Sequence, residues 1–301
     1  MGFLGNIPVS YHFKGREILA SAIHAFSLDV SHRGYGLLLL KRLLESAPGV
    51  EYFVGSTANA HSSAVLDRLG VPRCPVGDWE RSAFWITNHD GFARCAVSRK
   101  GWPGSWVSPA SLGLKMYDKF LTTSWPRQNH ELSRQTSFDE RFDIFWQDLQ
   151  HAYPNRFLAT RSREVLDWHF KFSLAQNKAW IVTYENGSRV LAYAIFHRQD
   201  HDELNLRRVR LIDHQALPES ADVLPSMLAW GLRESREQGV HMLEAFGFRS
   251  DKQRAIDLLA PHRRKLSSWS YFHKISYPAL QHELRDLQVW DPSQFDGDAS
   301  L

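Results

Sequence analysis

The sequence is poor in cysteine. Its 301 residues include two, Cys74 and Cys95, which lie far apart and lack the short spacing of a metal-binding or redox pair. This excludes a disulfide-stabilised scaffold and a cysteine-based metal centre, and no other cluster of metal ligands stands out, so we expect no metal. A chain that depends on no disulfide suits a reducing compartment, and we expect a cytoplasmic protein.

Long apolar runs are also missing. No segment approaches the roughly 18 consecutive apolar residues of a membrane span, and no basic stretch followed by an apolar core stands at the N-terminus. Neither sign of charge is in large excess, because 36 Lys and Arg face 33 Asp and Glu, for a net charge of +3. We therefore expect neither a membrane nor a nucleic acid among the partners.

Apolar material is abundant. Hydrophobic residues make up 43% of the chain and charged residues 23%, which is typical of a globular protein, and 301 residues suit two domains. Aromatic residues are frequent, with 11 Trp and 18 Phe. We attribute them to packing within and between domains rather than to stacking on bases.

One stretch near the N-terminus combines three local signals. A β-prone segment, residues 18–28, leads into a turn with Arg33, Gly34 and Gly36, and a leucine-rich segment at helical spacing follows over residues 37–44. The pattern predicts a strand, a loop and a helix N-terminus. Such a terminus presents backbone N–H groups and a positive dipole end to an anion, and glycines allow close approach. The stretch is a candidate pyrophosphate cradle, although a glycine-rich turn without a ligand has the same pattern.

A second signal follows along the chain. Residues 50–56 predict a short buried strand, and residues 59–69 predict a helix that ends at Gly70. Two motifs in this order and at this separation are more specific than either motif alone.

At these residues the chain resembles the Gcn5-related N-acetyltransferase (GNAT) superfamily. Arg33-Gly34-Tyr35-Gly36 looks like the pyrophosphate loop of that family, and residues 59–71 look like the helix that follows its next strand. The resemblance implies acetyl-CoA or another acyl-CoA as cofactor and a small-molecule amine as acceptor. It assigns cofactor binding to Leu28, Val30, Arg33, Gly34, Tyr35, Gly36 and Asn59.

Two positions depart from the family pattern. Leu38 stands where a small residue is usual, and Leu66 stands where a tyrosine often protonates the leaving thiolate. The family also places a further strand and two helices ahead of the loop, where this sequence has only hairpin material. Either these elements are encoded upstream of residue 1, or the acceptor site is completed by the C-terminal half or by another subunit of a homo-oligomer.

The C-terminal half resembles a second, more complete copy. Helical patterns precede a hairpin with Asn186-Gly187 at its turn, and strands and helices then alternate, but no Arg-Gly-x-Gly follows the strand at 204–213. We predict an α+β fold of two GNAT-like units, each a mixed, mostly antiparallel sheet flanked by helices. The expected division is 1–111 for a partial unit with the cofactor loop, 112–137 for a connecting segment, 138–290 for the second unit and 291–301 for an exposed tail. Within the first unit, residues 88–111 look like a linker or lid.

His24 is the best-placed general base. It lies on the strand that enters the loop, and an imidazole titrates near neutral pH. A histidine on an apolar strand is often structural, however, and His61 competes for the role, although a solvated helix N-terminus is the expected place for it. Asp213 and His214 are expected to be structural, because neighbours on a strand point to opposite faces.

Two further clusters have structural interpretations. The basic run at residues 207–210 is expected to be a solvated strand face, with contact to an anionic acceptor as the alternative. Trp168, with Phe170 and Phe172 beside it, is expected to lie in the core rather than to serve as a ligand platform.

Three functions fit these observations. The first is an acyl-CoA-dependent N-acyltransferase, most simply an N-acetyltransferase, acting on a small amine or an amino sugar. The second is a Fem-like aminoacyl transferase, against which stand the modest net charge and the lack of a predicted helical-hairpin arm. The third is a non-catalytic GNAT-like binding or assembly protein, which the departures at Leu38 and Leu66 favour.

Overall fold

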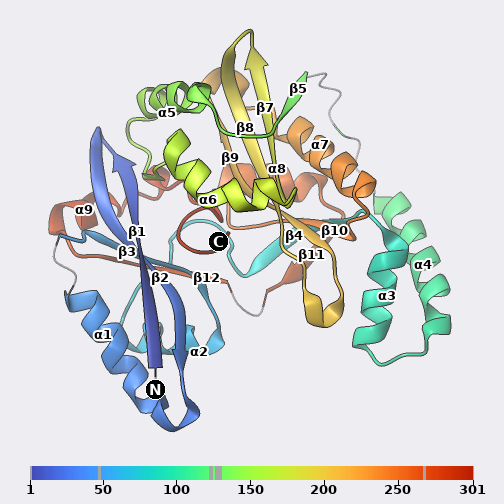
Figure 1. The fold of residues 1–301 in the computed structure, drawn as a ribbon, viewed down its shortest axis with the longest axis horizontal. Helices are drawn as coiled ribbons and strands as arrows, with labels where there is room; N and C mark the ends of the chain where they lie inside the picture. Colours follow the sequence, from blue (N-terminus) through green and yellow to red (C-terminus); the bar gives the residue numbers. More distant parts are fainter. Residues whose placement is uncertain (1, 47–48, 122–124, 126–130, 267–268, 301) are drawn as a thin grey trace.

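Two β-sheets with helices packed between and outside them make up the structure (Figure 1). The computed structural model describes residues 2–46, 49–121, 125, 131–266 and 269–300. In these residues the strand order is β12-β3-β2-β1-β6 in the first sheet and β11-β4-β10-β9-β8-β7-β5 in the second.

The first sheet contains β1 (Gly2–Phe13), β2 (Arg16–Leu28), β3 (Tyr52–Ala58), β6 (Leu158–Ala159) and β12 (Ser270–Ile275). The second contains β4 (Arg81–Ile86), β5 (Leu132–Gln135), β7 (Ala179–Asn186), β8 (Arg189–Arg198), β9 (Arg208–Ala216), β10 (Met242–Ala245) and β11 (His262–Lys265). The helices are α1 (Gly36–Ser46), α2 (Ala60–Arg68), α3 (His89–Arg99), α4 (Val107–Leu121), α5 (Glu140–Ala152), α6 (Arg163–Ala175), α7 (Leu224–Glu237), α8 (Ser250–Leu259) and α9 (Pro278–Glu283).

The predicted fold class is confirmed. Each sheet has one parallel pair, β2 with β3 and β9 with β10, and its other strand pairs are antiparallel. Both predicted hairpins form, one at the N-terminus and one next to Asn186-Gly187. Lys14-Gly15 joins β1 to β2 with positive φ at both residues, and Gly187-Ser188 joins β7 to β8 with positive φ at the glycine. These are the turns that match the twist of antiparallel strands.

Strands from each half of the chain lie in the sheet of the other half. β4 lies within residues 1–111, the expected first unit, but it pairs with β10 and β11 in the second sheet. The last strand, β12, pairs instead with β3 in the first sheet. Hydrogen-bonded strand partners therefore cross the boundary expected at residue 111.

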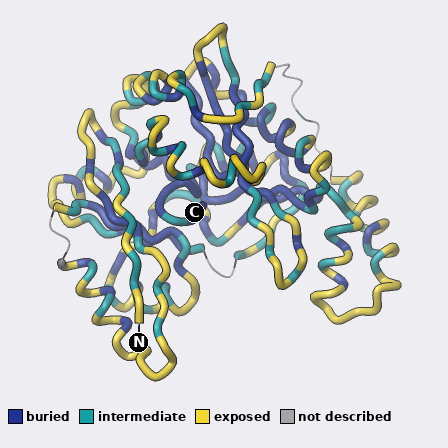
Figure 2. Tube along the Cα trace, viewed as in Figure 1, coloured by how far each residue is buried: buried dark blue, intermediate teal, exposed yellow. Residues whose placement is uncertain are grey.

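The apolar residues form layers on both faces of both sheets. Leu40 and Leu66, from α1 and α2, cover the outer face of the first sheet, and α7 and α8 cover that of the second. Between the sheets, α5 and α6 contribute Phe142, Phe145 and Phe170 to a large central core. Figure 2 shows this interior as the dark, buried part of the trace.

Residues 88–111 are not a linker. They form α3 and the start of α4, which pack side by side as a helical hairpin beside the second sheet (Figure 1). Asn88 caps α3 through Gly91 N–H, and Ser111 of α4 donates a hydrogen bond to Asp90 of α3. Asp118 ties the hairpin to β11 by binding His262. The absence of a helical hairpin therefore no longer counts against an aminoacyl transferase.

The segment expected to be an exposed tail is buried over residues 291–300, and Leu301 lies outside the described residues. Asp291, Gln294 and Ser300 are each at most 1% exposed, and the C-terminal end lies at the centre of the view in Figure 1. Trp290 and Phe295 belong to the central core, while Asp291 binds Lys252 at 2.9 Å. The expectation was wrong because an acidic, small-residue composition was taken as a sign of exposure, whereas cations from other parts of the fold bind these acids.

The basic run at residues 207–210 is also not a solvated face throughout. Arg210 is 1% exposed and binds Glu244 of β10 at 2.9 Å, and Arg208 lies 3.6 Å from the same carboxylate. The local pattern could not identify a buried partner on another strand. Within the described residues, no helix combines the length and the apolar character needed to cross a bilayer.

Candidate functional site

The first sheet opens where β2 and β3 part. The two strands pair in parallel only over Ala20–Ala22 and Tyr52–Val54, and β2 then continues to Leu28 and β3 to Ala58. A register shift between β1 and β2 and a positive φ of 50° at Ala25 mark the point of divergence. Among the described residues, the edge of β2 that faces this gap has no strand partner beyond Ala22. Its free N–H and C=O groups can pair with an extended amide chain.

A cavity of about 190 Å³ lies in the gap. His24 and Phe26 of β2 line one side, and Thr57, with Asn59 and Ser62 at the start of α2, lines the other. The structure thus brings together two of the residues singled out from the sequence, His24 and Asn59.

His24 is held by a carboxylate from the far end of the chain. Its Nδ1 lies 3.0 Å from Oδ2 of Asp298, whose other oxygen accepts hydrogen bonds from Ser56 at 3.1 Å and Thr57 at 3.0 Å. The Asp298 side chain is 7% exposed and that of His24 is 45% exposed. A carboxylate can only accept from Nδ1–H, which leaves Nε2 free. Asp298 was missed in the sequence because it lies 274 positions from His24, where no spacing rule applies.

The predicted glycine turn takes a compact form. Residues Val30–Tyr35 make a 3₁₀ turn, η1, and Gly36 starts α1. A Cβ on Gly36 would lie 2.7 Å from Cδ1 of Leu28, so a larger residue at the start of the helix would displace the Leu28 side chain at the end of β2. The N–H of Gly36 is donated to the Arg33 carbonyl, so a phosphate bound through that N–H would have to replace this hydrogen bond. A Cβ on Gly34 would meet no atom within 4 Å, so the outer side of the turn is open.

The other predicted cofactor residues surround this turn. Val30 and Tyr35 are 75% and 61% exposed, and the Arg33 side chain, also exposed, makes no ion pair within the described part of the chain. Leu28 fills the space between Gly2 and the start of α1. Asn59 caps α2 by accepting from two backbone N–H groups at 3.0 Å, so its carboxamide oxygen is already engaged.

Among the described residues that line the gap, no tyrosine takes the place of Leu66. That leucine is 4% exposed in the outer core of the first sheet, and Ser62, one helical turn before it, supplies the hydroxyl that lines the gap on α2. His61 lies exposed at the start of α2, as expected. No group of three potential metal ligands occurs among the residues that the structure describes.

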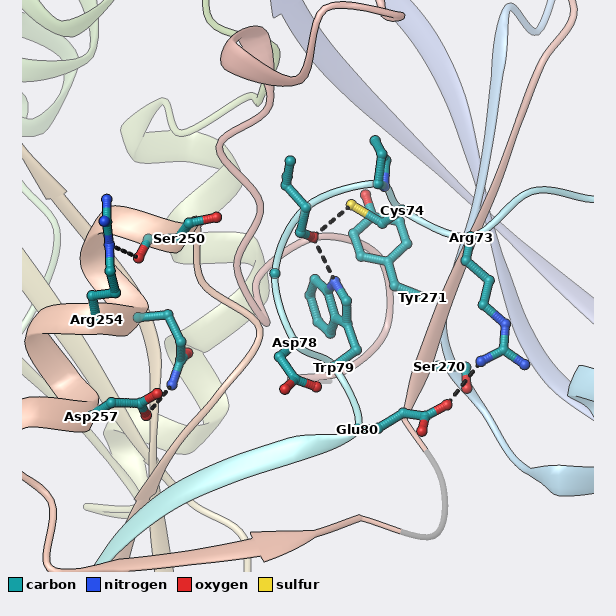
Figure 3. A pocket seen from close by; sticks show the side chains of 14 residues that line it. Arg73, Cys74, Asp78, Trp79, Glu80, Ser250, Arg254, Asp257, Ser270 and Tyr271 are labelled. Atoms are coloured by element: carbon teal, nitrogen blue, oxygen red, sulfur yellow. Dashed lines mark hydrogen bonds and ion pairs between the residues drawn. The ribbon is translucent and has the colours of Figure 1, made fainter.

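A different cavity, of about 460 Å³, lies where residues 73–80 meet α8 (Figure 3). The guanidinium of Arg73 binds Glu80 at 2.9 Å and Asp67 at 3.2 Å, and Arg254 binds the Ser250 carbonyl. Burial raises the pKa of the Cys74 thiol to about 12, which keeps it protonated and poorly nucleophilic. The arginines that line this cavity thus already bind other groups of the protein, and the thiol in it is unreactive.

Asp213 is structural, as predicted. Arg161 binds it at 2.8 Å, and Tyr193 donates to it at 2.7 Å. Burial opposes the charge on Asp213, but Arg161 and these hydrogen bonds outweigh it and lower the pKa to about 2. Burial raises the pKa of the neighbouring Asp296 to about 7, although Arg161 partly opposes this. The network joins β8, β9 and the segment before α6 to the C-terminal segment.

The fold is shared with acyltransferases of known structure. N-myristoyltransferase of Saccharomyces cerevisiae with bound myristoyl-CoA matches 90% of this chain at 10% identity, with a TM-score of 0.55. A GCN5-related N-acetyltransferase from Kribbella flavida matches 91% at 11% identity with a TM-score of 0.51, as does a probable N-acyltransferase from Enterococcus faecalis.

These likenesses define the fold. The chain spans 63%, 56% and 58% of the length of the three solved proteins, respectively. No family model and no curated protein matches the sequence. The structure is therefore GNAT-like, with two mixed sheets flanked by helices, as the resemblance at residues 28–71 implied.

Proposed function

We propose that this protein is an acyl-CoA-dependent N-acyltransferase. The observation that carries the proposal is the gap between β2 and β3, with an unpaired strand edge on one side and the His24–Asp298 pair inside it. The GNAT-like fold supports it, because structural neighbours with this fold are described as N-acyltransferases. Acetyl-CoA is the simplest donor, and the acceptor is a small amine.

The residues around the gap fit a CoA thioester. The free edge of β2 offers backbone partners for the amides of the pantetheine arm, and the exposed Arg33 offers a cation for the pyrophosphate. Asn59 and Ser62 lie where the arm would pass α2. When bound, acyl-CoA supplies the activated acyl group.

His24 acts as the general base in this proposal. Asp298 fixes its orientation through Nδ1, so Nε2 takes the proton from the ammonium of the acceptor. The acceptor nitrogen then forms the amide bond as the carbon–sulfur bond breaks, and it releases its second N–H proton to solvent. The thiolate takes a proton from solvent, since Leu66 cannot give one. Paired GNAT-like units, with the second lacking a cofactor loop, complete the proposed architecture.

The first test is binding of acetyl-CoA measured by titration calorimetry. We expect the wild-type chain to bind, and Arg33→Ala to lose about tenfold or more in affinity, because a charge-assisted contact to phosphate is removed. Arg42→Ala is the matched control, since it removes an exposed arginine from the outward side of α1 and should bind normally.

Two outcomes would count against the proposal. Folded wild-type protein that binds no acyl-CoA would favour a non-catalytic GNAT-like protein. Two observations agree with that alternative: the Gly36 N–H already donates to the Arg33 carbonyl, and position 66 is a leucine. Equal affinities for the wild type and Arg33→Ala would move the cofactor away from residues 33–36.

A further inference from the structure

An apolar cavity of about 540 Å³ opens between β1, α6 and the C-terminal segment. Its walls are mainly aliphatic and aromatic side chains, among them Ile7, Val9, Val165, Trp168 and Phe295. Enclosed sites for small ligands usually measure about 300–1,000 Å³. Trp168 was expected in the core, but it is 53% exposed at the mouth of this cavity, because α6 buries Phe170 instead. Its indole is thus available to a ligand.

The cavity adjoins the reacting end of the gap. Ile7 in its wall lies two residues from Gly5, the strand partner of His24. Alternate residues of a strand share a face and lie about 7 Å apart, so His24 and the cavity are on the same side of the sheet. Gly297 lines the cavity, and its neighbour Asp298 holds His24. The cavity and the gap that holds His24 therefore adjoin each other across the C-terminal segment.

Few polar groups in the cavity are free. Ser10 donates to Thr160 at 2.8 Å, and His169 binds Ser300 at 2.7 Å, while burial lowers the pKa of His169 to about 3 and keeps it neutral. A sugar placed here would lose its hydration without gaining hydrogen bonds, at a cost for each hydroxyl. Glu164 is the exception, because it is exposed at the rim and makes no hydrogen bond or ion pair with the described residues.

We propose that this cavity is the acceptor pocket, and that it takes an amine carried on an apolar, aromatic-sized body rather than an amino sugar. The apolar walls and Trp168 bind the body, and Glu164 attracts the ammonium to the rim electrostatically. The amine then reaches His24, which takes its proton. This inference rests on the proposed function, because it requires an acyl donor in the neighbouring gap.

The test compares tryptamine with glucosamine as acceptors of the acetyl group of acetyl-CoA, with the products measured by mass spectrometry. We expect tryptamine to be the better substrate by kcat/KM. Trp168→Ala should raise its KM about tenfold or more, with kcat and the KM for acetyl-CoA little changed. Phe172→Ala is the control, since it removes an aromatic ring from the same helix, 70% exposed and outside the cavity, and should change nothing.

A binding measurement separates this inference from the proposed function. Tryptamine titrated calorimetrically into the chain without acetyl-CoA should bind equally to the wild type and Phe172→Ala, and about tenfold or more weakly to Trp168→Ala. That result supports the pocket even if no acyl group is transferred. Three results would overturn it: no tryptamine binding, a preference for glucosamine, or a Trp168→Ala effect on the KM of the acyl-CoA instead of the amine.

Discussion

Glu244 lies fully buried in the second sheet, surrounded by arginines. Arg210 binds it at 2.9 Å, Arg264 also contacts it, and Ser82 donates to it at 2.7 Å. Burial disfavours its charge, but the arginines outweigh burial and lower its pKa to about 2. A buried charge of this kind is tolerated only while its partners remain.

Glu244→Ala should therefore be strongly destabilising. The substitution leaves Arg210 buried without its partner, and we expect the free energy of unfolding to fall by about 3–5 kcal/mol. Denaturant titration measures this, with Glu237→Ala, which is exposed on α7, as a control expected to stay within about 0.5 kcal/mol. A small effect of Glu244→Ala would mean that the cluster of arginines is solvated.

His24→Ala tests the base at the same scale. We expect kcat for amine acylation to fall about 100-fold, with the KM for acetyl-CoA nearly unchanged, because the imidazole moves a proton and does not hold the donor. Added imidazole should restore part of the rate. His61→Ala, exposed at the start of α2, is the matched control, and a larger loss there would identify His61 as the base.

At the scale of elements, the C-terminal segment holds the two sheets together without regular strand or helix structure over residues 291–300. It binds Lys252, which also donates to the backbone of His214, and Gln294 donates to the carbonyl of Phe246 beyond β10. Further on, Asp298 enters the gap of the first sheet. The segment thus packs against the second sheet at the place where β9 extends past β10. In the gap of the first sheet it contributes one carboxylate, that of Asp298.

Phe295→Ala should show that this segment is part of the core. The ring is 5% exposed and lies 6.0 Å from Phe170 between centroids, so its removal leaves a cavity and should cost about 3–5 kcal/mol of unfolding free energy. Thermal or urea unfolding measures it. Leu287→Ala, at a side chain 51% exposed, should be nearly neutral, and an equal loss in both variants would contradict the assignment.

At the scale of the whole molecule, the exchange of β4 and β12 makes one folding unit of the two halves. β4 lies between β10 and β11, and β12 pairs with β3. Either half alone would expose unpaired strand edges and half of the central core.

Calorimetry should accordingly show one unfolding transition for the chain, with equal calorimetric and van't Hoff enthalpies. Fragments 1–111 and 138–301, expressed separately, should not fold. Two resolved transitions, or a folded fragment, would show that the halves are independent domains.

Stability should fall as the pH drops from about 7 to 4. Burial lowers the pKa of His214 to about 3 and of His197 and His273 to about 4, so the folded state binds fewer protons than the unfolded state in this range. Asp296, with its pKa raised to about 7, acts in the opposite direction over the same range but is one group against several.

We expect a net loss on the order of a few kcal/mol, measured by urea unfolding at each pH. His273→Gln should reduce the slope. Stability that rises as the pH falls would mean that Asp296 dominates.

Local signals allowed much of the fold to be predicted. The hairpin turns at Lys14-Gly15 and Gly187-Ser188, the helix after the glycine turn and the mixed sheets all arise from φ preferences and periodicity over a few residues. The placement of His24 on the strand before the turn could also be predicted from the sequence, since strand and loop are adjacent in the chain.

What the sequence determined by itself was therefore the set of elements and the class of fold, because backbone preferences act between neighbours. Only the tertiary structure decided which sheet receives β4, that Asp298 holds His24, that Arg210 is buried and that Trp168 is exposed. Each of these depends on contacts between residues far apart in the chain, and no spacing or composition rule encodes such a partner. The burial of residues 291–300 likewise depends on contacts between residues far apart in the chain, since their acidic side chains are stabilised by cations from the rest of the fold.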